Sequence, residues 1–256
     1  MLSGERLASR YRPVAVVTGA SSGIGAATVV ALGRLGFQIA GGARRLERVR
    51  RVVGESGLAL PLDVTRLDSI EEFVAGVKKK FGRIDVLVNN AGLARGLTPV
   101  AEGVDQDWIE MWEANVLGLL RMTREALPLI RKARHGHIVN LGSIAGFEVY
   151  KGGAGYTATK HAVHAISRTL RLELSGEPIR ITEVMPGLVE TEFSVVRFHG
   201  DRDAAKGVYK GVKPLVAADI ADCIAFAVTR PPHVDIDEMV VRPIAQAASW
   251  LVARKP

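Results

Sequence analysis

The sequence has a single cysteine, no long apolar run and no secretory signal. Cys223 alone excludes a disulfide within the chain and agrees with a reducing cytosol. No apolar run approaches the ~20 residues of a membrane-spanning helix, so we expect no membrane association. Residues 1–12 contain arginines but lack the apolar segment of a signal peptide. We therefore expect a flexible N-terminal leader on a cytoplasmic protein.

Repeats, low-complexity tracts and linkers rich in Pro, Gly or Ser are also absent. With 256 residues, 48% of them apolar and 24% charged, the chain fits one globular domain over residues 13–256. The formal charge of +7 favours anionic partners. The basic residues are spread along the chain rather than clustered, which argues against nucleic acid and favours an anionic cofactor. His135 and His137 lack a third ligand, so we expect no metal site.

Short apolar runs alternate with longer helical patterns along the chain. We predict strands at 14–17, 37–43, 58–64, 85–88, 137–141, 179–184 and 239–241. The helical patterns cover 24–35, 69–81, 107–133, 156–174 and 218–228, with Asp105 and Asp107 expected to cap the third of these helices. Strands that are apolar throughout are buried on both faces, so the order predicts an open, doubly wound α/β sheet.

A glycine-rich turn follows the first predicted strand and opens a helix. In Thr18-Gly19-Ala20-Ser21-Ser22-Gly23-Ile24-Gly25, the first glycine allows a sharp turn and the second lets the backbone approach a phosphate. The third permits close packing of helix on strand, and the helix N-terminus can bind a pyrophosphate. Glycine turns are common, so it is the position between strand and helix that predicts a dinucleotide site.

The second predicted strand ends without an acidic residue and runs into Arg44 and Arg45. An acidic residue there would bind the ribose 2′-hydroxyl, whereas an arginine accommodates a 2′-phosphate, so the sequence favours NADP(H) over NAD(H). The alternative is a solvated arginine pair at the start of the next helix. Asp63, at the end of the third strand, could bond the adenine amino group. Small residues in Asn89-Asn90-Ala91-Gly92 would let the backbone pass close to the ribose, although such segments are more often simple turns.

Tyr156 and Lys160 stand four residues apart, with Ser143 upstream. On a helix these positions share a face, so the phenol and the ammonium can project into one cleft. The positive charge is expected to lower the pKa of Tyr156 and so prepare it for proton transfer near neutral pH. An isolated match of this kind is more often a solvated pair.

These motifs together resemble the short-chain dehydrogenase/reductase family over nearly the whole chain. The resemblance implies a single Rossmann-like domain with a seven-stranded parallel sheet, helices on both faces, and a homo-oligomer (tetramer or dimer) formed by helices 107–133 and 156–174. It assigns Tyr156 as the general acid/base, Lys160 as the residue that tunes its pKa, Ser143 as the group that holds the substrate oxygen, and Asn115 as the anchor of a water. The expected cofactor site comprises Gly19, Ser21, Ser22, Gly23, Ile24, Gly25, Arg44, Arg45, Asp63, Val64, Asn90, Ala91, Gly92, Tyr156, Lys160, Pro186, Gly187, Val189 and Thr191.

A narrower resemblance concerns the substrate. Segments 92–96, 152–156, 192–198 and 230–238 are similar to the NADP-dependent 3-hydroxy acid (serine/allo-threonine) dehydrogenases. This implies an NADP(H)-dependent oxidoreductase acting on a small 3-hydroxy acid or its semialdehyde. Arg95 and Arg197 are the candidate partners of a substrate carboxylate, and residues 188–213 are expected to form a mobile lid. Three alternatives stay open: a reductase of bulkier ketones, a non-catalytic NADP-binding sensor, and a structural oligomer with a vestigial pocket.

Overall fold

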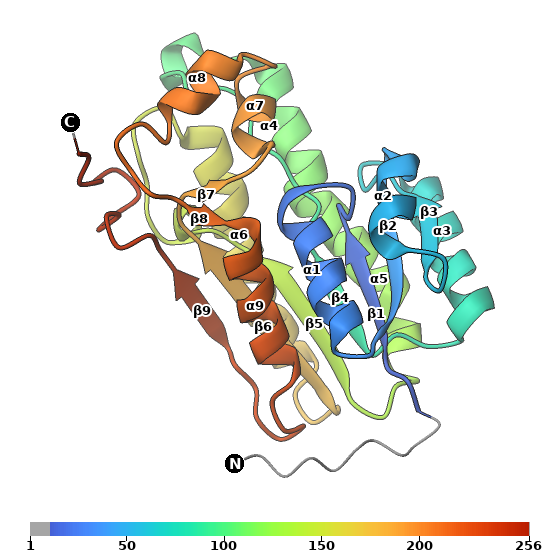
Figure 1. Cartoon of the computed structure of the whole chain (residues 1–256). Coiled ribbons are helices and arrows are strands. Elements are labelled where there is room, and N and C mark those ends of the chain that lie inside the picture. The colour runs from blue at the N-terminus through green and yellow to red at the C-terminus, as the bar shows by residue number, and fades with distance from the viewer. Residues whose placement is uncertain (1–10, 256) are drawn as a thin grey trace.

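A seven-stranded sheet forms the centre of the computed structural model, which describes residues 11–255 (Figure 1). Its strands are β1 (Val14–Thr18), β2 (Gln38–Ala43), β3 (Leu58–Pro61), β4 (Val86–Asn89), β5 (Gly136–Leu141), β6 (Ile179–Pro186) and β9 (Glu238–Val241). They lie in the order β3-β2-β1-β4-β5-β6-β9, and every neighbouring pair is parallel. The predicted fold class is confirmed.

Helices cover both faces of this sheet. The α-helices are α1 (Gly23–Arg34), α2 (Leu46–Val53), α3 (Leu67–Phe81), α4 (Asp105–Trp112), α5 (Gly118–Ile130), α6 (Ala154–Glu173), α7 (Phe193–Arg197), α8 (Arg202–Gly207) and α9 (Ala217–Val228). Shorter helical turns occur at η1 (Val100–Glu102), η2 (Glu113–Leu117) and η3 (Ile144–Gly146). None of the helices within residues 11–255 is both long enough and apolar enough to cross a membrane.

Two apolar cores result from the alternation of side chains along buried strands. Ala15 and Val17 of β1 belong to one core with residues of α1, α2 and α9. Val16, between them, points to the opposite face and joins a second core with residues of α3 and α5. This two-sided burial explains why β1 is apolar through Val17 rather than alternating with polar residues.

The helix predicted at 107–133 is interrupted. It begins at Asp105 as α4, passes through a π-helical turn at η2, and continues as α5 to Ile130. The prediction that Asp105 and Asp107 cap this helix is wrong, because Val104 occupies the cap position and no side chain caps it. Both aspartates instead lie in the first turn, where their charge favours the helix dipole.

A second, two-stranded sheet lies outside the main one. The strand β7 (Val189–Glu190) pairs in parallel with β8 (Leu215–Val216), joining Val189 to Leu215 and Glu190 to Val216. The segment between these strands contains α7 and α8, neither of which the sequence analysis predicted. The pairing therefore brings together the two ends of most of the predicted lid.

The flexible leader predicted at residues 1–12 lies outside the described residues, apart from Tyr11 and Arg12. The Tyr11 hydroxyl donates a hydrogen bond to Asp85. Arg83 donates to the carbonyl of Arg12 at 2.8 Å. Both contacts fix the chain directly before β1.

Candidate active site

The candidate site lies where the strand order reverses, between β1 and β4. In open parallel sheets a crevice forms at this point, outside the carboxyl ends of the strands. Here it contains a cavity of about 950 Å³, lined by the segments that follow β1, β2, β3, β4, β5 and β6. The predicted site residues that line it are Gly19, Ser21, Ser22, Gly23, Ile24, Arg44, Arg45, Asp63, Val64, Asn90, Ala91, Gly92, Ser143, Tyr156, Lys160, Pro186, Gly187, Val189 and Thr191. Gly25 and Asn115 do not line it.

The glycine-rich turn has the geometry of a phosphate cradle. Gly19 has a φ of +67°, which favours glycine. A Cβ atom at Gly25 would lie 2.4 Å from the carbonyl oxygen of Gly19, so this position packs the helix against the turn. The side chain of Asn90 braces the same turn by donating to the carbonyl of Thr18 at 2.8 Å. No side chain caps the start of α1, so its first backbone N–H groups remain available to an anion. This geometry fits a dinucleotide pyrophosphate.

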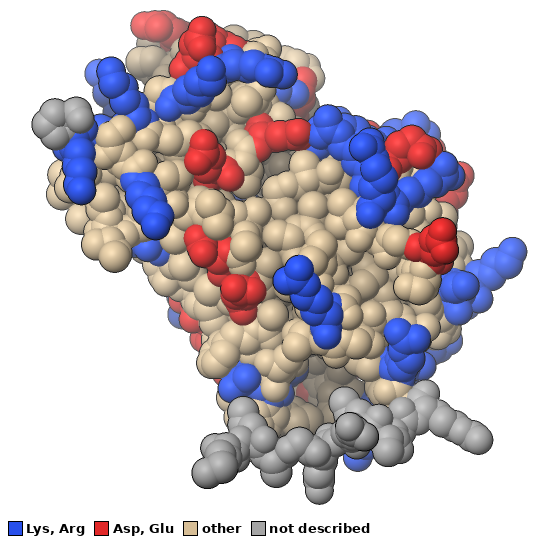
Figure 2. Space-filling view, in the orientation of Figure 1, with Lys and Arg blue, Asp and Glu red and all other residues tan. Residues whose placement is uncertain are grey.

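The two arginines after β2 differ in their contacts. Arg44 is exposed and has no hydrogen-bond or ion-pair partner among residues 11–255. Arg45 is paired: its Nη1 lies 2.7 Å from Glu192 Oε2, and its Nη2 donates to Ser22 Oγ at 2.7 Å. Although basic residues are spread along the chain, Figure 2 shows several gathered over α2, which begins directly after Arg45. This positive edge of the cavity fits a 2′-phosphate.

Asp63, predicted to bond adenine, forms a turn with its own neighbour. Its Oδ1 accepts hydrogen bonds from the backbone N–H of Thr65 at 3.1 Å and from the Thr65 hydroxyl at 2.8 Å. The carboxylate still lines the cavity, with Val64 beside it. Asp63 would therefore bind an adenine through its other carboxylate oxygen, Oδ2.

Tyr156 lies near the amino end of α6, within the cavity. Its ring meets that of Phe193 edge to face, with centroids 5.6 Å apart. Burial raises the pKa of Tyr156 to about 12, against the opposing effects of the Arg197 charge and a hydrogen bond with Ser143. The lowered pKa predicted from the Lys160 charge is wrong for the protein alone, because burial of the phenol outweighs the charge that does lower this pKa, which is that of Arg197.

Lys160 follows Tyr156 by one helical turn and is buried. Its Nζ donates to the carbonyl of Leu141 at 2.7 Å and lies 5.9 Å from the centroid of the Tyr156 ring. Burial lowers the pKa of Lys160 to about 8, and the charge of Glu183 opposes this shift. The hydrogen bond to Leu141 therefore holds the ammonium in a fixed position on the Tyr156 side of the cavity.

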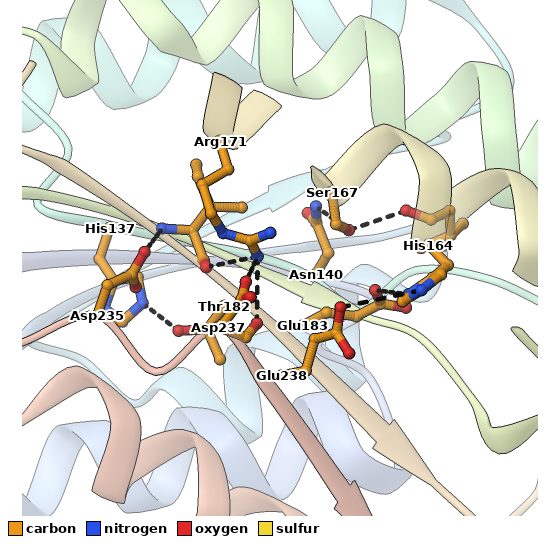
Figure 3. Close-up of polar contacts among 12 residues, drawn as sticks. His137, Asn140, His164, Ser167, Arg171, Thr182, Glu183, Asp235, Asp237 and Glu238 are labelled. Atoms are coloured by element: carbon orange, nitrogen blue, oxygen red, sulfur yellow. Dashed lines mark hydrogen bonds and ion pairs between the residues drawn. The ribbon is translucent and has the colours of Figure 1, made fainter. Parts of the chain in front are cut away.

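Glu183 and His164 belong to a polar cluster between β6 and α6 (Figure 3). Glu183 of β6 is fully buried, and its Oε2 lies 2.8 Å from His164 Nδ1. Its other oxygen has no hydrogen-bond partner among the described residues. Burial raises the pKa of Glu183, while the hydrogen bond and charge of His164 and the charge of Lys160 oppose this. Because His164 is one turn beyond Lys160 on α6, the cluster supports the inner side of that helix.

Asn115 lies in the π-helical turn η2 and is buried behind the cavity. Its amide accepts a hydrogen bond from the backbone N–H of Leu93 and donates one to the Leu93 carbonyl, each at 2.8 Å. It also donates to Thr159 Oγ1 at 3.0 Å. Asn115 thus fixes the loop after β4 against α6, and π-turns of this kind occur often at functional sites.

Arg197 lies among aromatic rings beside Tyr156. Its guanidinium carbon is 5.0 Å from the centroid of the Tyr156 ring, 5.5 Å from that of Phe193 and 5.9 Å from that of Tyr150. Its Nη2 donates to the Tyr150 hydroxyl at 2.8 Å. No role for Tyr150 or Phe193 is predicted from the sequence. Only their shared contact with Arg197, formed by the fold, distinguishes them from other aromatic residues.

Arg95, the other predicted carboxylate partner, does not line the cavity. Its Nε lies 2.8 Å from Glu110 Oε2, and its Nη1 donates to the carbonyl of Val196 at 2.8 Å. Its charge is already compensated by Glu110, and its position anchors the segment that carries α7. Of the two candidate partners of a substrate carboxylate, Arg197 therefore lines the cavity and Arg95 does not.

The family model described as short chain dehydrogenase matches residues 13–201. An uncharacterized oxidoreductase of Mycobacterium tuberculosis is 51% identical, covering 95% of this chain and 96% of its own. An NADP-dependent 3-hydroxy acid dehydrogenase of Schizosaccharomyces pombe is 44% identical, covering 94% and 96%.

Among solved structures, the closed form of serine dehydrogenase complexed with NADP+ has a TM-score of 0.89 and 37% identity, covering 95% of this chain and 100% of that one. The match of the family model extends over most of the strands and over Tyr156 and Lys160. The chain therefore belongs to the short chain dehydrogenase family, as its motifs predict.

Proposed function

We propose that this chain is an NADP(H)-dependent oxidoreductase that transfers hydride between nicotinamide and a small alcohol or carbonyl substrate. The observation that carries the proposal is the convergence of Ser143, Tyr156 and Lys160 in one cavity that extends to Arg44 and Arg45. The relatives named for NADP-dependent dehydrogenation and the NADP+ complex of serine dehydrogenase support it.

The residues around the cavity divide into two groups in this proposal. The turn from Gly19 to Gly25 would hold the pyrophosphate, and Arg44 and Arg45 would hold the 2′-phosphate. The segments that contain Asn90, Pro186 and Thr191 would enclose the remainder. When bound, the cofactor supplies the hydride chemistry, and the protein supplies position and charge.

Ser143 and Tyr156 would act on the substrate oxygen. In carbonyl reduction, negative charge develops on that oxygen, and two hydroxyl donors already placed there stabilise it. Tyr156 would then give its proton to this oxygen. Since burial raises the pKa of Tyr156 to about 12, the phenol carries this proton at neutral pH. In alcohol oxidation it must lose the proton, which the charge of Arg197 favours.

We infer that the substrate is a 3-hydroxy acid or the matching semialdehyde. A substrate carboxylate needs a cation, and Arg197 lines the cavity within 5.0 Å of the Tyr156 ring centroid. The relatives named 3-hydroxy acid dehydrogenase and serine 3-dehydrogenase support this class.

A parallel assay would test the proposal. The chain is supplied with NADP(H) or NAD(H) and a panel of 3-hydroxy acids, semialdehydes and apolar ketones. We expect turnover of the acids with NADP(H). Tyr156→Phe should lower kcat by about 10²–10⁴-fold while NADPH binding stays unchanged. Full activity of the Phe variant would contradict the mechanism, and tight NADPH binding without turnover of any carbonyl would indicate a sensor instead.

A further inference from the structure

Glu192 joins the segment that carries α7 to the arginines of the opposite side of the cavity. Its Oε2 lies 2.7 Å from Arg45 Nη1, and its Oε1 lies 2.7 Å from Arg48 Nη1. Arg45 directly precedes α2 and Arg48 lies within it, whereas Glu192 directly precedes α7. One carboxylate therefore links two elements separated by more than a hundred residues of sequence.

The other side of Arg45 contacts the glycine-rich turn. Its Nη2 donates to Ser22 Oγ at 2.7 Å and to Ser21 Oγ at 3.3 Å. The guanidinium thus lies between two serine hydroxyls and the carboxylate of Glu192, and all four residues line the cavity. Hydroxyls and guanidinium groups together are the donors that an anionic phosphate requires. The Glu192 carboxylate occupies the position of such an anion.

The two ion pairs hold the Glu192 carboxylate in place, yet they are weak enough for another anion to displace it. Hydrogen bonds from Arg45 and then Arg48 lower the pKa of Glu192, so it is ionised at neutral pH. All three side chains are nearly half exposed, at 46% for Arg45, 45% for Arg48 and 47% for Glu192. Exposed ion pairs are easily exchanged for another anion. A phosphate monoester carries more charge than one carboxylate and offers more acceptor oxygens.

We propose that Glu192 competes with the cofactor's 2′-phosphate for Arg45 and thereby sets cofactor discrimination. This inference rests on the proposed placement of the 2′-phosphate. Glu192 leaves Arg45 when a 2′-phosphate binds it and stays when the nucleotide lacks one.

Binding of two nucleotide fragments tests the competition without turnover. Adenosine 2′,5′-bisphosphate carries the 2′-phosphate, adenosine 5′-monophosphate lacks it, and neither has a nicotinamide. By calorimetry, Glu192→Gln should tighten the bisphosphate about two- to fivefold, the range that loss of an exposed ion pair predicts. The monophosphate should bind unchanged.

Glu47→Gln is the matched control. It removes an equal charge from α2, where Glu47 pairs with Arg50 at 2.5 Å and does not line the cavity. A gain in Glu192→Gln that exceeds the gain in Glu47→Gln supports direct competition. Equal effects in both variants, or weaker bisphosphate binding in Glu192→Gln, would overturn it.

Binding of the two fragments to the unaltered protein tests the placement of the 2′-phosphate. If the unaltered protein binds both fragments equally, the placement of the 2′-phosphate itself fails, which is distinguishable from a failure of Glu192 alone.

Discussion

At the scale of residues, the chemistry of the cavity depends on which charges are already paired. Arg44 and Arg45 are adjacent, yet only Arg45 is engaged by Glu192 and the serines of the glycine-rich turn. Arg95 is bound by Glu110, while Arg197 extends into the cavity among aromatic rings. The sequence alone does not distinguish the arginines that have a carboxylate partner from those that lack one, because each partner lies elsewhere in the chain.

The unpaired Arg44 leads to a prediction on cofactor choice. Arg44→Asp should weaken NADPH binding by about ten- to hundredfold, since a charge-assisted hydrogen bond contributes about 1.5–3 kcal/mol. NADH binding should change far less. A fluorescence titration with both cofactors measures this, with Arg51→Asp as a control on α2 that does not line the cavity. Equal losses for the two cofactors would show that Arg44 does not read the phosphate.

Arg197 leads to a prediction on substrate choice. When the substrate is a 3-hydroxy acid, Arg197→Met should raise KM by about tenfold or more, because the carboxylate loses a charge-assisted partner. For neutral carbonyl substrates KM should stay the same. Because the Arg197 charge lowers the pKa of Tyr156, its loss should also move the rise of kcat for alcohol oxidation to higher pH. Steady-state kinetics across pH would measure both, and identical KM values for acids in the variant and the parent would remove Arg197 from the substrate site.

At the scale of elements, most strands and helices could be predicted because their signals are local. The apolar runs of β1, β4 and β5 and the glycines after β1 specify the sheet and the turn without distant partners. The π-turn around Asn115 could not be predicted, since it depends on contacts with Leu93 and Thr159 from other elements. The helices α7 and α8 have only five and six residues, which is too short for a helical periodicity to be detected.

The pairing of β5 with β6 leads to a prediction on acid stability. Burial lowers the pKa of His137 on β5 to about 3, and its Nε2 lies 2.8 Å from Thr182 Oγ1 of β6. The unfolded chain binds this proton near pH 6.5 and the folded chain does not, so stability falls as the pH drops from about 6.5 toward 3. Between about pH 7.5 and pH 5 the expected loss in unfolding free energy from His137 is about 2 kcal/mol.

Urea unfolding at both pH values measures this loss. Between these two pH values, the loss in unfolding free energy should be about 2 kcal/mol smaller in His137→Gln than in the parent protein, whatever the stability of the variant at pH 7.5. His135→Gln, which alters an exposed imidazole two residues away, should keep the dependence. The same pH slope in all three proteins would show that His137 is not the group that titrates.

At the scale of the whole molecule, exposed apolar side chains gather on the helices predicted to join subunits. Ile109 and Trp112 of α4 are 49% and 46% exposed, and Leu172 of α6 is 79% exposed. A single chain of 27.5 kDa leaves these apolar side chains exposed to water. We therefore predict a homo-oligomer, a tetramer or a dimer, whose subunits contact each other through α4 and α6.

Light scattering after size exclusion tests this assembly. Trp112→Glu should lower the mass toward that of one chain, because a carboxylate cannot be buried unpaired in an apolar interface. Val30 is 41% exposed on α1, which packs on the other face of the sheet. Val30→Glu should therefore leave the mass unchanged. A monomeric parent protein at micromolar concentration would refute the prediction.

The small β7–β8 ladder has an evolutionary consequence. Its two residue pairs hold the entry and the exit of residues 191–214 side by side. Insertions, deletions or whole replacements can then be accommodated there without strain on the central sheet. Sequence changes in this stretch can thus alter the lining that Phe193 and Arg197 give to the cavity, while the central sheet and α6, which carries Tyr156 and Lys160, keep their positions.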